Sequence, residues 1–354
     1  MKYYRIITLV ILTAFLAAAC GPAESESKEL NLYAWSEYVP QALLDNFTAE
    51  TGIKVNYDAY SSNEELMAKL QAGASGYDVI IPSDYTVTIL ANQGLLEKLD
   101  LAQVPNFKNI GEPFKNRDFD PGNQFTVPYQ WGTACLVVDT SKVTRPITKW
   151  ADLWSPEFEQ RLVLLDDERE VLGMVLMTLG YDRNSTDPAQ LEEAKVKLIE
   201  LMPNVRLFDS DSPKTALLAG EVWLGLTWNG EAALARSENS SIDYIFPEEG
   251  CSIWFDNLAI PKDPPHIDAA LKFMNFVLDP ASSVLISMEF PYSNPNLAAL
   301  DLMKTQEPDA YEAYMNFAAT NPSAEQLART YPVKDIGEAT ALWDRIWTEV
   351  KGGE

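Results

Sequence analysis

The side chains best suited to chemistry in this sequence are aromatic rings and carboxylates that occur together in short bursts. The bursts are Trp35-Ser36-Glu37-Tyr38, Ser83-Asp84-Tyr85, Asp167-Glu168-Arg169-Glu170, Trp228-Asn229 and Trp254-Phe255-Asp256. Carboxylates form charge-assisted hydrogen bonds with ammonium groups. Aromatic faces attract cations and also cover methylene groups. The combination therefore suits an organic polycation such as an alkyl polyamine.

The elements that must position these bursts begin with alternating strands and helices. The patterns predict strands over 30–35, 53–57 and 78–81, and helices over 40–52, 62–73 and 86–92. A βαβαβ order predicts a parallel sheet with helices on both faces. Ligands of such sheets lie beyond the carboxyl ends of the strands, which is where Trp35, Tyr38, Ser83 and Tyr85 fall.

The same alternation continues after a long predicted strand over 125–138. Further strands are expected over 161–165, 205–208, 222–228, 242–246 and 252–260, with helices over 168–179, from Asp187-Pro188 onward and over 213–219. The chain from residue 267 is mostly helical in pattern. These elements are enough for two α/β lobes.

Several of the same residues also have structural interpretations. Asp167 with Glu170 has the spacing of a helix N-cap, and Asn229 has the character of an N-cap after Trp228. Trp35 and Trp254 would suit a core, although a buried unpaired carboxylate beside them would be costly, which favours a cleft wall. Two tryptophan pairs four residues apart are interpreted as packing residues, namely Trp150 with Trp154 and Trp343 with Trp347.

The N-terminus is interpreted as an export signal. Lys2 and Arg5 precede an apolar run over 6–19, shorter than the roughly 20 residues that span a membrane. Small residues lead to Cys20, which predicts a lipoprotein signal peptide over 1–19 with lipid attached to Cys20; ordinary cleavage after Ala19 is the alternative. Residues 20–29 are small, polar and acidic, and are expected to form a flexible tether.

Composition narrows the classes of function. The formal net charge is −25, which repels nucleic acid and anionic lipid and attracts cations. The single histidine, His266, is expected to be a solvated loop side chain. Without further histidines there is no Ser-His-Asp triad and no His-rich zinc site, and neither a Walker loop nor a dinucleotide fingerprint occurs. We therefore expect no metal, no cofactor and no catalytic residue.

Longer motifs carry a resemblance to a known family. They include Tyr33-Ala34-Trp35-Ser36-Glu37-Tyr38-Val39-Pro40, Tyr77-Asp78-Val79-Ile80-Ile81-Pro82-Ser83, Leu165-Asp166-Asp167-Glu168-Arg169-Glu170-Val171 and Trp254-Phe255-Asp256-Asn257-Leu258-Ala259-Ile260-Pro261. In this order and spacing the chain resembles the bacterial spermidine/putrescine-binding periplasmic proteins, the extracytoplasmic receptors of polyamine ABC importers. The resemblance implies an α/β, two-lobed periplasmic-binding-protein fold of type II, with mainly parallel sheets flanked by helices and a ligand cleft between the lobes. It divides the chain into lobe 1 (30–133 and 255–300) and lobe 2 (134–254 and 301–354).

The resemblance also implies a ligand set. It comprises Trp35, Ser36, Glu37, Tyr38, Ser83, Tyr85, Asp167, Glu170, Trp228, Trp254, Asp256 and Tyr292. Asp167 and Glu170 would face one terminal ammonium, and Asp256 would hold an inner amine. Val333 falls where spermidine-type members carry a glutamine, which leaves spermidine and putrescine both open.

Further expectations follow from the family. Cys135 and Cys251 fall near the two lobe crossovers, so we hypothesise a disulfide that braces the hinge. The expected partners are a polyamine and an ABC permease, with no nucleic acid, and with a membrane only through the lipid anchor of a monomer at the cell membrane or in the periplasm. Two alternatives stay open: the same fold binding a sugar or ferric iron, and a carboxylate-based hydrolase using Asp167 with Glu170 or Asp256.

Overall fold

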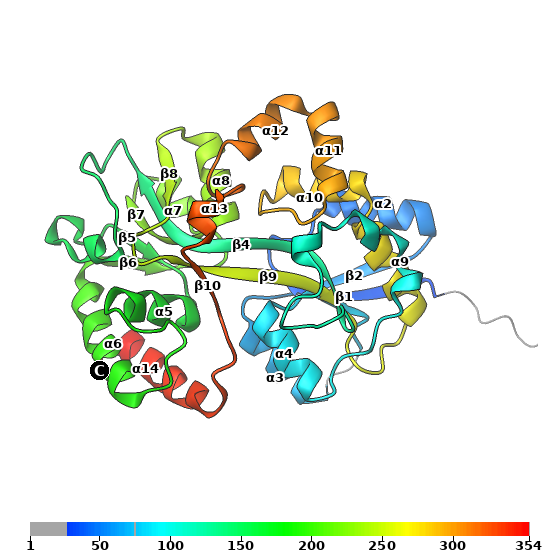
Figure 1. Cartoon of the computed structure of the whole chain (residues 1–354), viewed down its shortest axis with the longest axis horizontal. Helices are drawn as coiled ribbons and strands as arrows, with labels where there is room; N and C mark the ends of the chain where they lie inside the picture. The colour runs from blue at the N-terminus through cyan, green and yellow to red at the C-terminus, as the bar shows by residue number, and fades with distance from the viewer. Residues whose placement is uncertain (1–26, 74–75, 354) are drawn as a thin grey trace, which may run out of the picture.

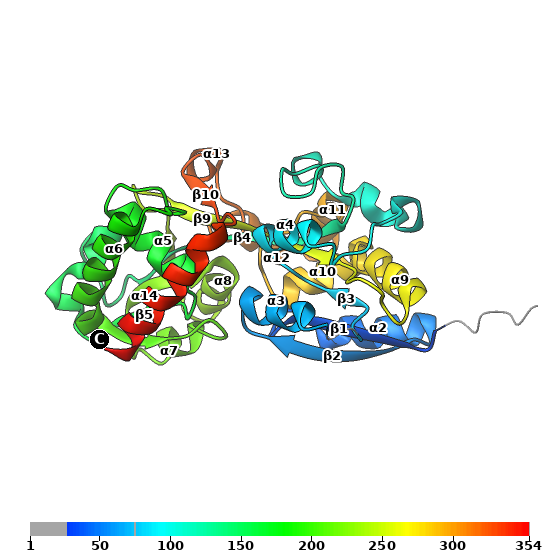
Figure 2. The same ribbon diagram turned by 90° about the horizontal axis from the view of Figure 1, so that it is seen from below.

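Two α/β lobes lie side by side and are joined by two long strands (Figure 1). The computed structural model describes residues 27–73 and 76–353. The predicted signal peptide and Cys20 therefore lie outside the described residues. The predicted two-lobed α/β architecture is confirmed, and Figure 2 shows the same two bodies from below.

The strands agree with the sequence patterns to within a few residues, apart from β10, which was not predicted. They are β1 (Glu29–Trp35), β2 (Lys54–Tyr60), β3 (Val79–Ile80), β4 (Thr126–Asp139), β5 (Leu162–Leu164), β6 (Val205–Phe208), β7 (Leu224–Trp228), β8 (Ile242–Ile245), β9 (Cys251–Ala259) and β10 (Thr330–Pro332).

The helices of the described chain flank these strands. They are α2 (Gln41–Thr51), α3 (Asn63–Gln71), α4 (Asp84–Asn92), α5 (Glu168–Thr178), α6 (Pro188–Leu201), α7 (Lys214–Leu218), α8 (Asn229–Glu238), α9 (Ile267–Val277), α10 (Pro280–Glu289), α11 (Leu297–Gln306), α12 (Pro308–Met315), α13 (Ala324–Leu327) and α14 (Thr340–Gly352).

One continuous sheet runs through both lobes in the order β2-β1-β3-β9-β4-β7-β5-β6. In lobe 1, β1 pairs in parallel with β2 and β3. In lobe 2, β5 pairs in parallel with β6 and β7. The strands β4 and β9 pair antiparallel in the middle. The carboxyl ends of the outer parallel strands are therefore the ends from which loops reach toward the space between the lobes.

The alternating directions of the side chains along β1 explain why lobe 1 has a layer of helices on each face of its sheet. Leu30 and Leu32 pack with the buried face of α2 and with α9. Tyr33, one position along, packs with α3 and α4 on the other face. Side chains alternate between the faces of a strand, so one short apolar segment fixes a helix layer on each side.

Lobe 2 is built around a single large core. Leu162, Val163 and Leu164 of β5 are fully buried, as expected for a parallel strand covered on both faces. Helix α5 is buried from Arg169 to Met177. The C-terminal helix α14 packs against α5 and α6, with Trp343 fully buried in the core.

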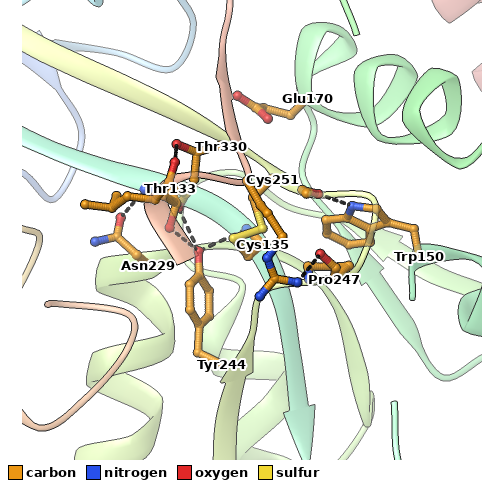
Figure 3. Close-up of a disulfide and its surroundings, with 12 residues drawn as sticks. Thr133, Cys135, Trp150, Glu170, Asn229, Tyr244, Pro247, Cys251 and Thr330 are labelled. Atoms are coloured by element: carbon orange, nitrogen blue, oxygen red, sulfur yellow. Dashed lines mark hydrogen bonds between the residues drawn. A yellow bond between two sulfur atoms is a disulfide. The ribbon is translucent and has the colours of Figure 1, made fainter. Parts of the chain in front are cut away.

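A disulfide joins β4 and β9, the two long strands that connect the lobes. Register pairs Ala134 of β4 with Ser252 of β9, which sets Cys135 opposite Cys251. These cysteines are joined by a disulfide with Cα atoms 5.2 Å apart (Figure 3). The Tyr244 hydroxyl accepts a hydrogen bond of 2.9 Å from the Cys135 backbone N–H. The antiparallel strand pair is thus cross-linked where it enters lobe 2.

Helix α11 packs against both α10 and α12 (Figure 1). Val284, Ala299, Met303 and Tyr314 form a small apolar cluster there. The exact division of the chain into lobes at 133/134, 254/255 and 300/301 stays a prediction. Among described residues no single helix is long and apolar enough to cross a membrane; α9 and α10 pass only as a pair bent by 74°.

The prediction of a solvated loop position for His266 is only partly right, because its side chain is 29% exposed but contacts a buried carboxylate. His266 is the residue before α9, and its Nδ1 lies 3.0 Å from Oδ2 of the fully buried Asp78. The His266 backbone N–H also donates to Asp78, at 2.6 Å. The buried carboxylate needs partners, and this histidine supplies two of them.

Candidate functional site

A cleft between the lobes has about 760 Å³ of space not filled by protein atoms, part of it open to solvent. The structure brings every residue of the predicted ligand set to its lining: Trp35, Ser36, Glu37, Tyr38, Ser83, Tyr85, Asp167, Glu170, Trp228, Trp254, Asp256 and Tyr292. Val333 lines it as well. Residues that the sequence analysis did not assign to the ligand set are Ser61, Asn63, Asp84, Arg169, Ser210 and Asp211.

Most of the residues that line the cleft lie at, or just after, the carboxyl ends of strands. The segments after β1, β2 and β3 reach the cleft from lobe 1, and those after β5, β6 and β7 reach it from lobe 2. Ser61 follows β2, and Ser210 follows β6. The strand-end rule applied to β2 and β6 would have found both, because the carboxyl ends of parallel strands share one edge.

Asp256 is the carboxylate that β9 contributes to the cleft. It is 5% exposed and accepts hydrogen bonds of 2.7 Å from the Tyr38 hydroxyl and 2.7 Å from the Ser83 hydroxyl. Asn63 donates to the Ser83 oxygen at 3.1 Å and so orients that hydroxyl. Within the described chain, Asp256 forms no ion pair. Burial raises the pKa of Asp256 to about 7, against the opposing effect of the two hydroxyl groups.

Aromatic rings of the same cleft pack edge to face against one another. The Trp254 ring lies 5.5 Å from that of Tyr292 and 6.2 Å from that of Trp228, measured between centroids. Tyr38 and Tyr292 are 5.3 Å apart. The Trp228 indole N–H donates to the Ser210 carbonyl at 3.0 Å, which fixes its ring. Such perpendicular packing holds the rings as rigid walls.

Two glycines give these rings their space. A Cβ at Gly132 would lie 2.5 Å from the Trp254 ring, and a Cβ at Gly230 would lie 2.6 Å from the Tyr292 ring. Asn229, interpreted earlier as an N-cap, is not one: its buried side chain donates to the Ala319 carbonyl at 2.9 Å. That contact ties the start of α8 to the chain that follows α12.

The second acidic group lies at the start of α5. Asp167 caps the helix, accepting from the Glu170 N–H at 3.0 Å, so the capping and the cleft-lining interpretations both hold. Burial, with the charges of Glu170 and Glu64, raises the pKa of Asp167 to about 7. Glu170 itself is buried and paired with the Arg183 guanidinium at 3.2 Å.

Arg169 is a cation of the protein inside the cleft. Its guanidinium lies 5.5 Å from the Tyr85 ring centroid and 4.9 Å from that of Trp343, and it donates to the Lys334 carbonyl at 2.7 Å. It therefore connects a lobe 1 ring with the lobe 2 core.

Direct contacts also cross the cleft between the lobes. The Ser36 hydroxyl donates to Asp211 at 2.8 Å, and the Lys214 ammonium reaches Glu37 at 3.3 Å and Glu231 at 3.1 Å. The polar groups of Ser36 and Glu37 are thus engaged by lobe 2 residues. No group of three or more His, Cys, Asp or Glu side chains suited to a metal ion occurs in the described ranges.

Comparisons with known proteins agree with this geometry. Residues 42–319 match the family described as bacterial extracellular solute-binding protein. A spermidine/putrescine-binding periplasmic protein of Salmonella typhimurium is 39% identical over 331 residues, covering 93% of each chain. A solved structure described as a putative spermidine/putrescine ABC transporter from Listeria monocytogenes has a TM-score of 0.87 at 31% identity, covering 93% of this chain and 100% of that one.

A further solved structure is that of a spermidine/putrescine ABC transporter substrate-binding protein from Streptococcus pneumoniae, in complex with calcium and HEPES. It is 35% identical with a TM-score of 0.76, and covers 92% of this chain and 99% of its own. These relatives are named as binding proteins or components of transporters rather than as enzymes.

Proposed function

Because this chain belongs to the bacterial extracellular solute-binding proteins, we propose that it captures a polyamine, spermidine or putrescine, and delivers it to an ABC importer. The three relatives reported above, which are 31–39% identical, carry spermidine/putrescine names. The proposal for this chain rests on those names together with the chemistry of its own cleft.

The observation that carries the proposal is the environment of Asp256. This carboxylate is buried, receives two neutral hydroxyl donors and has no cationic partner among the described side chains. A buried charge without a counter-ion is costly. A ligand ammonium would supply that counter-ion and make a charge-assisted hydrogen bond.

The aromatic walls suit the rest of such a ligand. Trp228, Trp254 and Tyr292 pack edge to face against one another and line the same cleft as Asp256. Each face in contact with a cation contributes about 0.5–2 kcal/mol, and the same faces cover methylene groups. A compact carbohydrate would use these walls too, but it has no charge to match Asp256.

The hydrolase alternative fits the cleft less well. A carboxylate pair acting in hydrolysis needs both members free to exchange protons or attack. Glu170 is instead held by Arg183, with both side chains at most 5% exposed. The named relatives are binding proteins, which favours capture over catalysis.

Export and membrane attachment complete the proposal. The periplasmic and extracellular relatives support export of this chain. We propose that the lipid on Cys20 anchors a monomeric receptor at the cell membrane or in the periplasm, where it meets its permease. A diacylglyceryl group with two chains would suffice for stable attachment.

Calorimetric titration of putrescine and spermidine into the native protein and Asp256→Asn tests the proposal. Removing one charge of a buried pair costs about 2–5 kcal/mol, so we expect affinity to fall at least thirtyfold. Asp45→Asn, on the exposed face of α2, is the matched control and should bind normally. Native protein that binds neither polyamine, or Asp256→Asn that binds like the native protein, would contradict the proposal.

A further inference from the structure

Lys214 places a protein ammonium group against Glu37, a residue of the cleft lining. Its Nζ lies 3.1 Å from both carboxylate oxygens of Glu231, 3.3 Å from Glu37 and 3.0 Å from the Ser212 hydroxyl. The Lys214 side chain is 18% exposed and that of Glu231 is 5% exposed. This ammonium is therefore held by several acceptors rather than extended into solvent.

The two carboxylates that hold it come from different lobes. Glu37 lies in the turn after β1 in lobe 1, and Glu231 lies in the first turn of α8 in lobe 2. Lys214 begins α7 in lobe 2. Its ammonium thus bridges carboxylates across the cleft, which is what an ammonium of a captured ligand does when a two-lobed receptor closes.

Lys214 keeps its charge in this setting. Burial acts to lower its pKa, but attraction to Glu231 and Glu37 outweighs that effect, and the net result is a raised pKa. The group is a permanent cation at neutral pH.

Glu37 is fixed in an unusual backbone conformation. Its φ is +47°, in the left-handed region, which costs a non-glycine residue about 1–3 kcal/mol and persists only where the surroundings enforce it. The neighbouring hydrogen bond from Ser36 to Asp211, at 2.8 Å, also crosses the cleft. The turn is therefore held against lobe 2 by two polar contacts.

We propose that the Lys214 ammonium occupies a position beside Glu37 that a ligand ammonium could otherwise fill. Lys214 would thereby make the receptor selective for a diamine over a triamine. This inference rests on the proposed function. Glu37 and Glu231 are taken by Lys214, and Glu170 is taken by Arg183. Of the four acids in the predicted ligand set, Asp256 and Asp167 have no ion pair among the described residues, so these two are expected to face the ammonium groups of a diamine. Asp84 and Asp211 also line the cleft without an ion pair in the described part of the chain.

A third ligand ammonium would meet two obstacles at this end of the cleft. The Glu37 carboxylate is engaged, and the Lys214 ammonium repels another cation nearby. Rejecting a competitor by placing a like charge in its path is a common source of specificity.

The test compares putrescine and spermidine binding by calorimetry in the native protein and Lys214→Met, which keeps the stem but removes the charge. We expect the native protein to prefer putrescine at least tenfold. Lys214→Met should bind spermidine at least tenfold tighter than the native protein does, because a charge-assisted hydrogen bond to Glu37 becomes available. Putrescine affinity should change less than threefold.

Three further variants make the result decisive. Lys214→Arg should keep the native preference, and Lys197→Met, which removes a half-buried lysine of lobe 2 that does not line the cleft, should leave both affinities unchanged. If Lys214→Met fails to fold because Glu231 is left unpaired, the double variant Lys214→Met with Glu231→Gln replaces it.

Two results overturn the inference. One is a spermidine-to-putrescine affinity ratio that is the same with and without Lys214, and the other is a native protein that prefers spermidine. Both leave the proposed function intact, since the receptor would still bind polyamines. Native protein that binds neither compound removes the proposed function and this inference together.

Discussion

At the residue scale, the carboxylates of the cleft divide by whether the protein supplies their cation. Glu170 has Arg183, and Glu37 has Lys214. Asp256 and Asp167 have hydrogen-bond donors but no ion pair in the described part of the chain. Because an unpaired buried carboxylate favours its neutral form, these two residues link ligand capture to protonation.

This linkage predicts a pH dependence. Burial raises the pKa of Asp256 to about 7 from its ordinary 3.8. A raised carboxyl pKa favours the unliganded fold at low pH, and that contribution is lost as pH rises from about 4 through 7. An ammonium ligand needs the carboxylate form, so affinity should rise from pH 5.5 to 8, by up to about tenfold per unit for each such group.

Calorimetry of putrescine at several pH values, in buffers of different ionisation heat, measures this effect. At pH 6 binding should release protons, and Asp256→Asn should release fewer. Asp84 also lines the cleft, and its pKa is raised to about 8, mainly by burial. The variant Asp84→Asn therefore separates the protons released by Asp84 from those released by Asp256. Affinity that is flat across this range would contradict the account.

Single residues also show where sequence reasoning ends. Tyr292 could be assigned only through resemblance, because it follows α10 in a loop with no acidic neighbour. Asn229 looked like an N-cap, but its side chain reaches Ala319, 90 residues away in the chain. The partner of His266 is Asp78, 188 residues away. Pairings at such separation depend on the assembled fold, not on local pattern.

At the element scale, the residues that follow the carboxyl ends of strands were the most reliable indication of where the site lies. Periodicity and capping residues predicted β1 to β9, α2 to α5 and α7 to within a few residues. They gave only the start of α6, and for α8 only a candidate N-cap at Asn229. The three-residue strand β10 was missed because Thr330–Pro332 is too short to show a period. It pairs in parallel with the start of β9, and it leads directly into Val333 at the cleft lining.

The disulfide between β4 and β9 yields a prediction at this scale. Replacing both Cys135 and Cys251 by Ala should lower the free energy of unfolding by about 2–4 kcal/mol, because the unfolded chain regains the freedom of a loop closed over a sequence separation of 116. Urea unfolding monitored by tryptophan fluorescence measures the difference.

A reductant provides the control for this experiment. Dithiothreitol should shift the urea midpoint of the native protein toward that of the double variant, and it should leave the double variant unchanged. Equal midpoints for the native protein with and without reductant would show that no cross-link stabilises the strand pair.

At the scale of the whole molecule, composition and topology act together. The net charge of −25 attracts cations over a distance that salt limits. The parallel strands of both lobes then bring their carboxyl ends to one cleft. The net charge could be predicted from the composition, and the position of the cleft from the order of the strands. The cross-cleft bond from Ser36 to Asp211 joins residues 175 apart, and only the assembled pair of lobes reveals it.

The most direct test of the account is a crystal structure of the protein with putrescine at pH 8. We predict one ammonium within hydrogen-bonding distance of the Asp256 carboxylate, with the methylene chain against the faces of Trp228 and Trp254. Putrescine bound outside this cleft, or in the cleft with Asp256 contacting only Tyr38 and Ser83, would contradict it.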